Sequence, residues 1–120
     1  MTTEAGAGSR IRAWWWTVLN RPGETYLETS AGALFAFGMA RAWRNGLLGD
    51  EVLPAIAKAM VGVRSRLVDG VDGPVVQGTS GPTSAGTFAE YSAVPQKDDI
   101  LYGIGAVILS LIETSGLPPR

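Results

Sequence analysis

Two stretches of helically spaced apolar residues, separated by only a few positions, constrain the fold more than any other feature of this sequence. In residues 30–45 apolar side chains recur every three or four positions, and Thr29 and Ser30 are good N-caps. Asp50 can cap a second helix, in which the apolar stripe continues to about Val68. Because so little chain joins the two segments, they predict an antiparallel helical hairpin.

A third apolar segment, residues 100–114, predicts a last helix with Asp98 or Asp99 as its N-cap. Its residues are apolar nearly all round, so we expect this helix to be buried on most sides. Gly103 and Gly105 lie within it, and close packing between helices explains them better than membrane insertion does.

The chain between the second and third helices is rich in turn and loop residues. Residues 69–74 have the composition of a turn, and residues 75–77 suit a short extended piece. Residues 78–86 are rich in Gly, Ser, Thr and Pro, and we expect residues 91–96 to be irregular as well. This order of elements predicts an all-α fold with a long Gly/Ser/Thr-rich loop before the last helix.

Length and composition fit one packed domain. The chain has 120 residues, of which 46% are hydrophobic and 18% charged, a balance that favours a buried core over disorder. We expect residues 1–10 to form a flexible tail, residues 11–116 a helical domain, and residues 117–120 a second short tail.

The sequence contains no cysteine and no histidine. Disulfides, thiolate nucleophiles and the commonest metal ligands are therefore excluded, and proton transfer would have to use carboxylates, Lys or Tyr. We expect no metal and no cofactor. The formal net charge of -1 gives no electrostatic support for nucleic-acid binding.

Neither a secretory signal nor a membrane span is evident. The first residues lack the basic region of a signal peptide. The longest apolar stretch, residues 100–112, is shorter than the roughly 20 residues that span a bilayer. We expect a cytoplasmic protein without membrane contact.

Five short blocks follow one another along the chain, and they are residues 15–22 (WWTVLNRP), 26–38 (YLETSAGALFAFG), 46–59, 76–80 (VQGTS) and 103–109 (GIGAVIL). The second block resembles the E-[ST]-S-[AG]-x-A-[ML]-F-x-[YF] motif of glycoside hydrolase families 88 and 105. The other blocks are similar to further motifs of these families, among them C-Q-G-T-[SG] and G-x-G-[AP]-[FV]-[IL]-L. The resemblance covers roughly residues 14–113.

The resemblance implies the fold and the reaction of the unsaturated glucuronyl and rhamnogalacturonyl hydrolases. Their fold is an α/α toroid of six helical hairpins, so this chain would be a partial toroid, its C-terminal portion. These enzymes hydrate the double bond of the unsaturated uronic acid that polysaccharide lyases leave at a non-reducing end. An Asp donates the proton, and no metal is needed. The implied partner is an unsaturated uronyl oligosaccharide, and the implied role lies in carbohydrate metabolism.

The chain departs from the family pattern where catalysis is concerned. It has no counterpart of the family's W-x-R-G-N-G-W block or of the catalytic Asp, which lie upstream of the matched part. Trp16 and Tyr102 stand where the family has His. We therefore name no catalytic residue, expect a truncated form that is inactive alone, and leave open whether the chain is an enzyme.

Aromatic residues are the candidates for sugar contact, because their faces suit the C–H side of a pyranose ring. We take Trp15, Trp16 and Tyr102 as candidate substrate-binding residues, with Trp15 the best supported by the resemblance. The alternative for Trp14 and its two neighbours is that they pack against an adjacent helix.

Other polar residues have simpler structural interpretations. Glu28 with Asp98 and Asp99 could form a catalytic carboxylate pair, but negative charge near helix N-termini explains them better. Residues 78–81 lack the Gly-Lys-[Ser/Thr] ending of a phosphate-binding loop. Solvated helix faces account for the arginines, which are Arg41, Arg44, Arg64 and Arg66.

Two functions from different classes are compatible with the sequence. The first is to bind, or once to have hydrolysed, oligosaccharides produced by lyases. The second is a non-catalytic helical module that self-associates, because a slice of a toroid exposes apolar helix faces. These faces would be covered by a second copy or by the missing upstream half of a toroid. A third alternative is that three helices of this length bury too little to fold alone.

Overall fold

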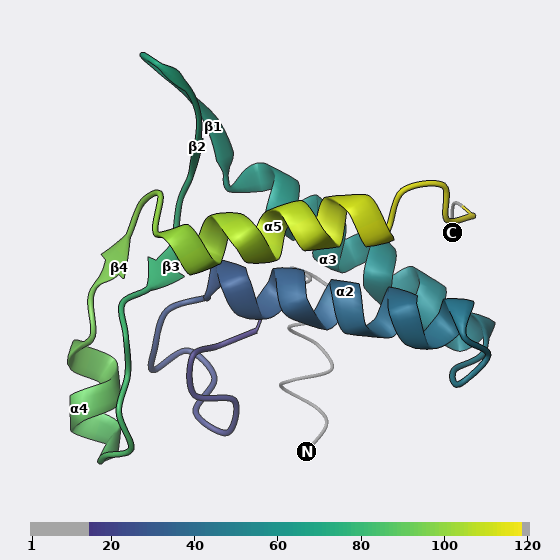
Figure 1. Ribbon diagram of the computed structural model, residues 1–120. Coiled ribbons are helices and arrows are strands. Elements are labelled where there is room, and N and C mark those ends of the chain that lie inside the picture. Colours follow the sequence, from purple (N-terminus) through teal and green to yellow (C-terminus); the bar gives the residue numbers. More distant parts are fainter. Residues whose placement is uncertain (1–14, 119–120) are drawn as a thin grey trace.

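The computed structural model describes residues 15–118, and its three longest helices pack against one another (Figure 1). α2 (Thr29–Arg44) and α5 (Leu101–Glu113) run side by side in the same direction, and α3 (Leu53–Ser65) packs beside them in the opposite direction. The predicted hairpin is α2 and α3, joined through the 3-10 helix η1 (Asp50–Val52). The predicted tail of residues 1–10 lies outside the described residues, as does Trp14.

Two small antiparallel sheets accompany the helices. β1 (Leu67–Gly70) pairs with β2 (Gly73–Val76), and β3 (Thr79–Ser80) pairs with β4 (Gln96–Lys97). A short helix, α4 (Phe88–Ala93), comes between β3 and β4 in the sequence. The prediction of a helix-rich fold is confirmed. The prediction of an all-α fold is not, because the described chain also contains these two small sheets.

The N-terminus of α2 is capped by Glu28, and not by Thr29 or Ser30 as predicted. The Glu28 carboxylate accepts a hydrogen bond from the backbone N–H of Ala31 at 2.6 Å. A carboxylate in this position satisfies an unpaired amide and adds favourable negative charge at the helix N-terminus. The Thr29 hydroxyl instead donates to the backbone carbonyl of Gln77 at 2.6 Å, which ties α2 to the chain after β2.

The core lies where α2, α3 and α5 meet. On α2 the buried residues are small, and Ala33, Ala36 and Ala40 have no exposed surface, so neighbouring helices can approach closely. The larger core side chains come from α3 and α5, and they are Leu53, Ile56, Met60, Val63 and Val107. Since fully burying one such side chain contributes about 1.5–3 kcal/mol, the meeting of these helices supplies most of the apolar stabilisation.

Ion pairs hold the C-terminal ends of α2 and α5 together. The guanidinium groups of Arg41 and Arg44 lie 3.0 and 3.2 Å from the Glu113 carboxylate. Arg44 also donates to the backbone carbonyls of Glu113 and Ser115, the latter at 2.7 Å. Carbonyls at a helix C-terminus lack partners within the helix and attract cations. These two arginines lie on an exposed face, as predicted, and also bind the end of the neighbouring helix.

α3 is shorter than predicted, because the chain enters a strand before it reaches Val68. The helix ends at Ser65, and Val68 lies in β1 opposite Val75 of β2. A cross-strand pair of β-branched side chains suits a sheet better than a helix. The turn predicted for residues 69–74 is confirmed as the tip of this hairpin, where Gly73 has a φ of +132°.

Asp50 does not cap α3. It is the first residue of η1, and its carboxylate accepts a hydrogen bond from the indole N–H of Trp43 at 2.9 Å. Val52 precedes α3 without any side-chain cap, and Pro54 occupies the first turn. Because proline has no N–H, it leaves one donor fewer to be satisfied at this helix terminus.

Part of the segment predicted as irregular, residues 91–96, belongs to α4. Thr87 and Glu90 form a capping box, in which each side chain accepts a hydrogen bond from the other residue's backbone N–H. The hydrogen bonds that Glu90 accepts from the backbone and the side chain of Thr87 lower the pKa of its carboxyl. This helix is too short to show apolar periodicity, so its caps are its only signal in the sequence.

The start of α5 is fixed by Asp99, which does not act as an N-cap. Asp99 has a φ of +50°, and its carboxylate accepts a hydrogen bond from the backbone N–H of Val76 at 2.8 Å. Ile100 precedes the helix and provides no side-chain cap. The carboxylate predicted to cap α5 therefore anchors it to β2.

The expectation that α5 is buried on most sides is wrong for the part of the chain that the structure describes. One face packs into the core, and Ala106 and Val107 belong to it. On the other faces Leu101, Ile108 and Ile112 are 86%, 50% and 67% exposed. Within residues 15–118, no helix combines the length and the apolar character needed to cross a membrane.

Replacing Gly103 by Ala should destabilise the chain, because the added methyl group would collide with the fully buried Thr79 side chain. We expect a loss of about 1–3 kcal/mol in the free energy of unfolding. Gly105→Ala is the matched control, since no atom lies within 4 Å of the position of its Cβ. That change should stabilise α5 by about 0.5–1 kcal/mol. Urea unfolding followed by circular dichroism measures both, and equal stabilities would contradict the close contact.

Candidate functional site

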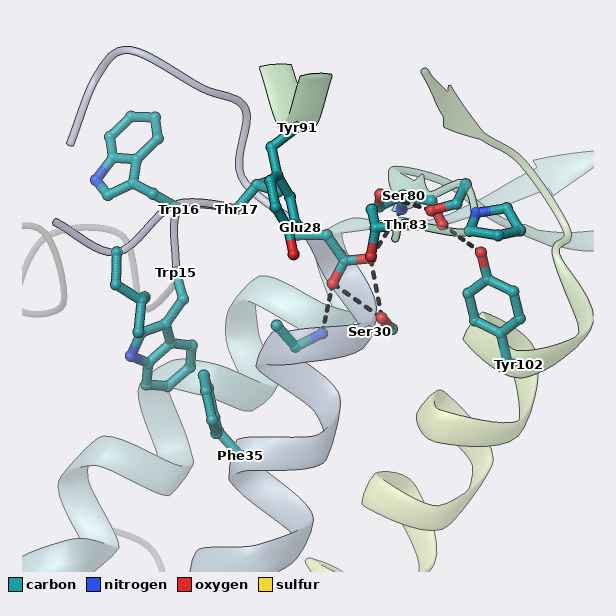
Figure 2. A pocket seen from close by; sticks show the side chains of 14 residues that line it. Trp15, Trp16, Thr17, Glu28, Ser30, Phe35, Ser80, Thr83, Tyr91 and Tyr102 are labelled. Carbon is teal, nitrogen blue, oxygen red and sulfur yellow. Dashed lines mark hydrogen bonds between the residues drawn. The ribbon is translucent and has the colours of Figure 1, made fainter. Parts of the chain in front are cut away.

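A cleft of about 460 Å³ opens at the N-terminal end of α2 (Figure 2). Its walls are the segment before α2, the first turns of α2, the chain that follows β3, and the start of α5. The volume lies within the range of about 300–1,000 Å³ that is typical of small-molecule sites. Segments far apart in the sequence thus meet around one hollow.

All three candidate sugar-binding residues, Trp15, Trp16 and Tyr102, line this cleft. Trp15 packs edge-on against Phe35 of α2, with ring centroids 4.7 Å apart, and it also contacts the core. In Figure 2 the Trp16 ring points away from Trp15 and Phe35, while its backbone pairs with that of Leu27. Trp15 therefore serves both as a packing residue and as a wall of the cleft, whereas Trp16 is less committed to packing.

Tyr102 reaches the cleft from the first turn of α5. Its hydroxyl donates a hydrogen bond to the backbone carbonyl of Ser80 at 2.5 Å. The side chain nevertheless remains half exposed. The ring is therefore held in a fixed position and is still accessible to a ligand.

Glu28 is the only Asp or Glu among the described residues that line the cleft, and its carboxylate is fully engaged in structural hydrogen bonds. It accepts from the backbone N–H of Ala31 at 2.6 Å, from the Ser80 N–H at 2.8 Å, and from the Ser30 hydroxyl at 2.9 Å. The residue is 7% exposed. These contacts support the structural interpretation of Glu28 over a catalytic one.

The predicted alternative of a carboxylate pair is not assembled. Asp98 and Asp99 do not line the cleft, and Asp99 is bound to the backbone of β2. No three carboxylates in the described part of the chain are grouped so that they could hold a metal ion.

The glycine-rich residues 78–81 are likewise used for structure. The Ser80 N–H is bonded to Glu28, the Gly81 N–H to the carbonyl of Pro95, and the Gly78 carbonyl accepts from the N–H of Thr29. Amides that are already paired cannot cradle a phosphate. The paired N–H groups of Ser80 and Gly81 support the structural interpretation of this loop.

A second hollow, of about 590 Å³, adjoins the cleft and shares Thr17, Leu19 and Tyr91 with it. We call it the Arg21 pocket; its remaining lining residues are Val18, Asn20, Arg21, Gly86 and Phe88. The guanidinium carbon of Arg21 lies 4.3 Å from the centre of the Phe88 ring, and an Nη atom lies 3.2 Å from the Glu24 carboxylate. Sequence reasoning missed this pocket, because only the fold brings α4 against residues 17–21.

Arg66 differs from the solvated arginine that the sequence predicts. It is partly buried, and burial lowers the pKa of its guanidinium group. Its side chain lies close to Gly78 and Thr29, so a side chain at position 78 would collide with it. Arg64, two residues earlier, is exposed as expected.

A family comparison accounts for this arrangement of helices and motifs. The model of Glycosyl Hydrolase Family 88 matches residues 10–117. The match covers most of the chain, so the chain belongs to this family. The resemblance of the five sequence blocks is thereby confirmed.

Solved structures show the same fold. A Salmonella enterica subsp. enterica serovar Paratyphi A protein, described as a possible member of the GH105 family, matches 90% of this chain with a TM-score of 0.78 and 28% identity. A Klebsiella pneumoniae subsp. pneumoniae protein of the same description matches 90% with a TM-score of 0.77 and 28% identity. A family 105 glycoside hydrolase of C. acetobutylicum matches 97% with a TM-score of 0.83; at 20% identity this likeness shows the fold alone.

The chain spans only a minor part of these proteins, namely 28%, 27% and 35% of their lengths. Comparison with curated protein sequences finds no match. What this chain contributes to a hydrolase site must therefore be argued from its own residues.

Replacing Glu28 by Gln should lower the free energy of unfolding by about 1.5–3 kcal/mol. The N–H of Ala31 donates to one carboxylate oxygen and the N–H of Ser80 to the other, and in glutamine one of these oxygens is replaced by an NH2 group, which cannot accept a hydrogen bond. Glu24→Gln is the control, since this side chain is 52% exposed and its ion pair contributes about 1 kcal/mol at most. Urea unfolding measures both variants. Similar losses in the two would contradict the structural role of Glu28.

Proposed function

We propose that this chain forms part of the sugar-binding site of a glycoside hydrolase that acts on unsaturated uronic acid oligosaccharides. The single observation that supports this most strongly is that Trp15, Trp16 and Tyr102 lie around one cleft, although they come from distant parts of the sequence. Family membership supplies the reaction class, and the cleft supplies a surface on which a sugar can bind.

The lining of the cleft combines the two kinds of contact that a sugar needs. Aromatic faces pack against the C–H side of a pyranose ring. Hydroxyl groups of Ser30, Thr83 and Tyr91, which also line the cleft, can exchange hydrogen bonds with sugar hydroxyls. The chemistry of the wall therefore suits an oligosaccharide better than a purely apolar ligand.

We further propose that the 120 residues do not hydrolyse the sugar by themselves. Hydration of a vinyl-ether double bond requires a group that donates a proton to carbon, and the family uses an Asp for this step. In the described part of the cleft the one carboxylate is Glu28, which is occupied by structural hydrogen bonds. The proton donor would come from the rest of a toroid, packed on the exposed apolar residues of α2 and α5.

We expect the chain to bind an unsaturated rhamnogalacturonan disaccharide without consuming it. Isothermal titration calorimetry measures the binding, and the ultraviolet absorbance of the double bond should stay constant, because Glu28, the one carboxylate among the described residues of the cleft, is held in structural hydrogen bonds. Trp16→Ala should weaken binding about two- to ten-fold. Trp43→Phe is the control, because Trp43 lies at the other end of α2 and bonds to Asp50. A loss of absorbance that follows the purified protein, or no effect of Trp16→Ala, would contradict the proposal.

A second candidate function, self-association, is favoured by the exposed apolar surface of the helices. α5 exposes large apolar side chains along most of its length, namely Leu101, Ile108, Leu109 and Ile112, and α2 adds Leu34 and Phe35. Large apolar patches on soluble proteins commonly mark interaction sites. In this alternative a second copy of the chain covers the surface that a toroid would otherwise bury.

Sedimentation velocity over a hundred-fold range of protein concentration tests self-association. If a second copy covers α5, the chain should dimerise, and Ile112→Glu should shift it to monomer because a charge would then be buried at the interface. Val61→Glu is the matched control, since Val61 is 68% exposed and lies on α3. A monomer at every concentration would rule out this function, and equal effects of the two variants would rule out α5 as the interface.

A further inference from the structure

We propose that the Arg21 pocket is a second sugar subsite, which binds the carboxylate of an acidic ring beyond the terminal one. This inference rests on the proposed function, in which the terminal unsaturated ring lies against the aromatic residues of the first cleft. It makes the preferred ligand an oligosaccharide with at least two uronic acids, rather than a disaccharide with one.

The two hollows adjoin each other. Thr17, Leu19 and Tyr91 line both of them, so a ligand that fills the first cleft lies directly beside the second and can extend over these residues into it. Each hollow is of the size of a small-molecule site, at about 460 and 590 Å³. Together they suit a chain of several sugar rings better than a single disaccharide.

Charge distinguishes the two hollows. Among the described residues that line them, Arg21 is the only Lys or Arg, and it belongs to the second hollow alone. The described lining of the first cleft includes no Lys or Arg, and its single carboxylate is already bonded. Among the described residues that line the two hollows, Arg21 is therefore the cation that can pair with the carboxylate of a second uronate ring.

The guanidinium group of Arg21 is held in place and keeps donors for a ligand. It lies over the Phe88 ring at 4.3 Å, a contact that orients the plane of the group. One Nη atom donates to Glu24 at 3.2 Å, and the side chain is 48% exposed. Since a guanidinium has five N–H donors, several remain for a carboxylate, which it binds best in a bidentate manner.

The ion pair of Arg21 with Glu24 does not by itself explain this arrangement. Exposed ion pairs such as that of Arg21 and Glu24 contribute between about 0 and 1 kcal/mol. The fold nevertheless brings Phe88, from the short helix α4, under a guanidinium near the start of the described chain. Recognition of an anion by Arg21 would explain why Phe88 holds the guanidinium group in this position.

The test compares two ligands by isothermal titration calorimetry with the full 120-residue chain. One is an unsaturated rhamnogalacturonan disaccharide, which has one carboxylate, and the other is the corresponding tetrasaccharide, which has two. We expect the tetrasaccharide to bind about ten-fold more tightly at low salt, because a charge-assisted hydrogen bond is added. Methyl esterification of the second uronic acid should abolish this advantage.

Arg21→Gln should remove the tetrasaccharide's advantage and leave the affinity for the disaccharide unchanged. Lys58→Gln is the charge-matched control, since Lys58 is exposed on α3 and lines neither hollow. If the wild-type chain binds both ligands equally, or if Lys58→Gln acts like Arg21→Gln, the inference fails while the proposed function stands. If Arg21→Gln weakens both ligands alike, Arg21 contacts the terminal ring, which also overturns the inference. If neither ligand binds at all, the proposed function fails as well.

A substitution that should strengthen tetrasaccharide binding, instead of weakening it, gives an independent test. Glu24 competes with a ligand carboxylate for Arg21, so Glu24→Gln should strengthen tetrasaccharide binding about two- to five-fold. It should not alter disaccharide binding. An unchanged or weaker affinity for the tetrasaccharide would show that Arg21 does not face a ligand carboxylate.

Discussion

The structure around the cleft depends on one carboxylate. Glu28 accepts hydrogen bonds from the start of α2 and from β3, so the helix and the strand cannot separate without leaving a buried acceptor unpaired. Tyr102 then joins β3 to α5, and Asp99 joins α5 to β2. The four elements α2, β3, α5 and β2 are thereby held together by side chains bonded to backbone groups, which orient the walls of the cleft more rigidly than apolar contacts alone.

Membership of glycosyl hydrolase family 88 and the residues of this cleft support different parts of the proposed function. The proposed reaction requires a proton donor, whereas the described residues of the two hollows offer aromatic rings, hydroxyls and one cation. The chain spans about a third or less of the structures it matches, and the proposal therefore gives it a share in binding. In the same proposal the rest of a toroid would cover the exposed residues of α5.

The main helices were predictable because apolar spacing over three or more turns is a strong signal, and α2 and α5 begin and end within one residue of the predicted positions. The end of α3 was not predictable in this way. The stripe of α3 continues past Ser65, so periodicity could not separate it from the strand that holds Val68. The capping box of Thr87 and Glu90 was readable in the sequence, yet six residues are too few for a periodic pattern. Trp15 and Trp16 could be named as candidate residues of the cleft because of the family resemblance. The pairing of Arg21 with Phe88 could not be predicted, because only the folded chain brings these two residues together.

Several hydrogen bonds that hold the fold together join residues far apart in the sequence, and this separation slows folding. Glu28 and Ser80 are 52 residues apart, and Arg44 and Ser115 are 71 apart. The hairpin of α2 and α3 is local and can form early, but non-local contacts raise the entropic cost of closure and slow folding. During synthesis, the hydrogen bond between Glu28 and Ser80 can form only after β3 has left the ribosome, and the cleft can form only after α5 has done so. Until α5 docks, the part of α2 that it covers in the folded chain stays exposed.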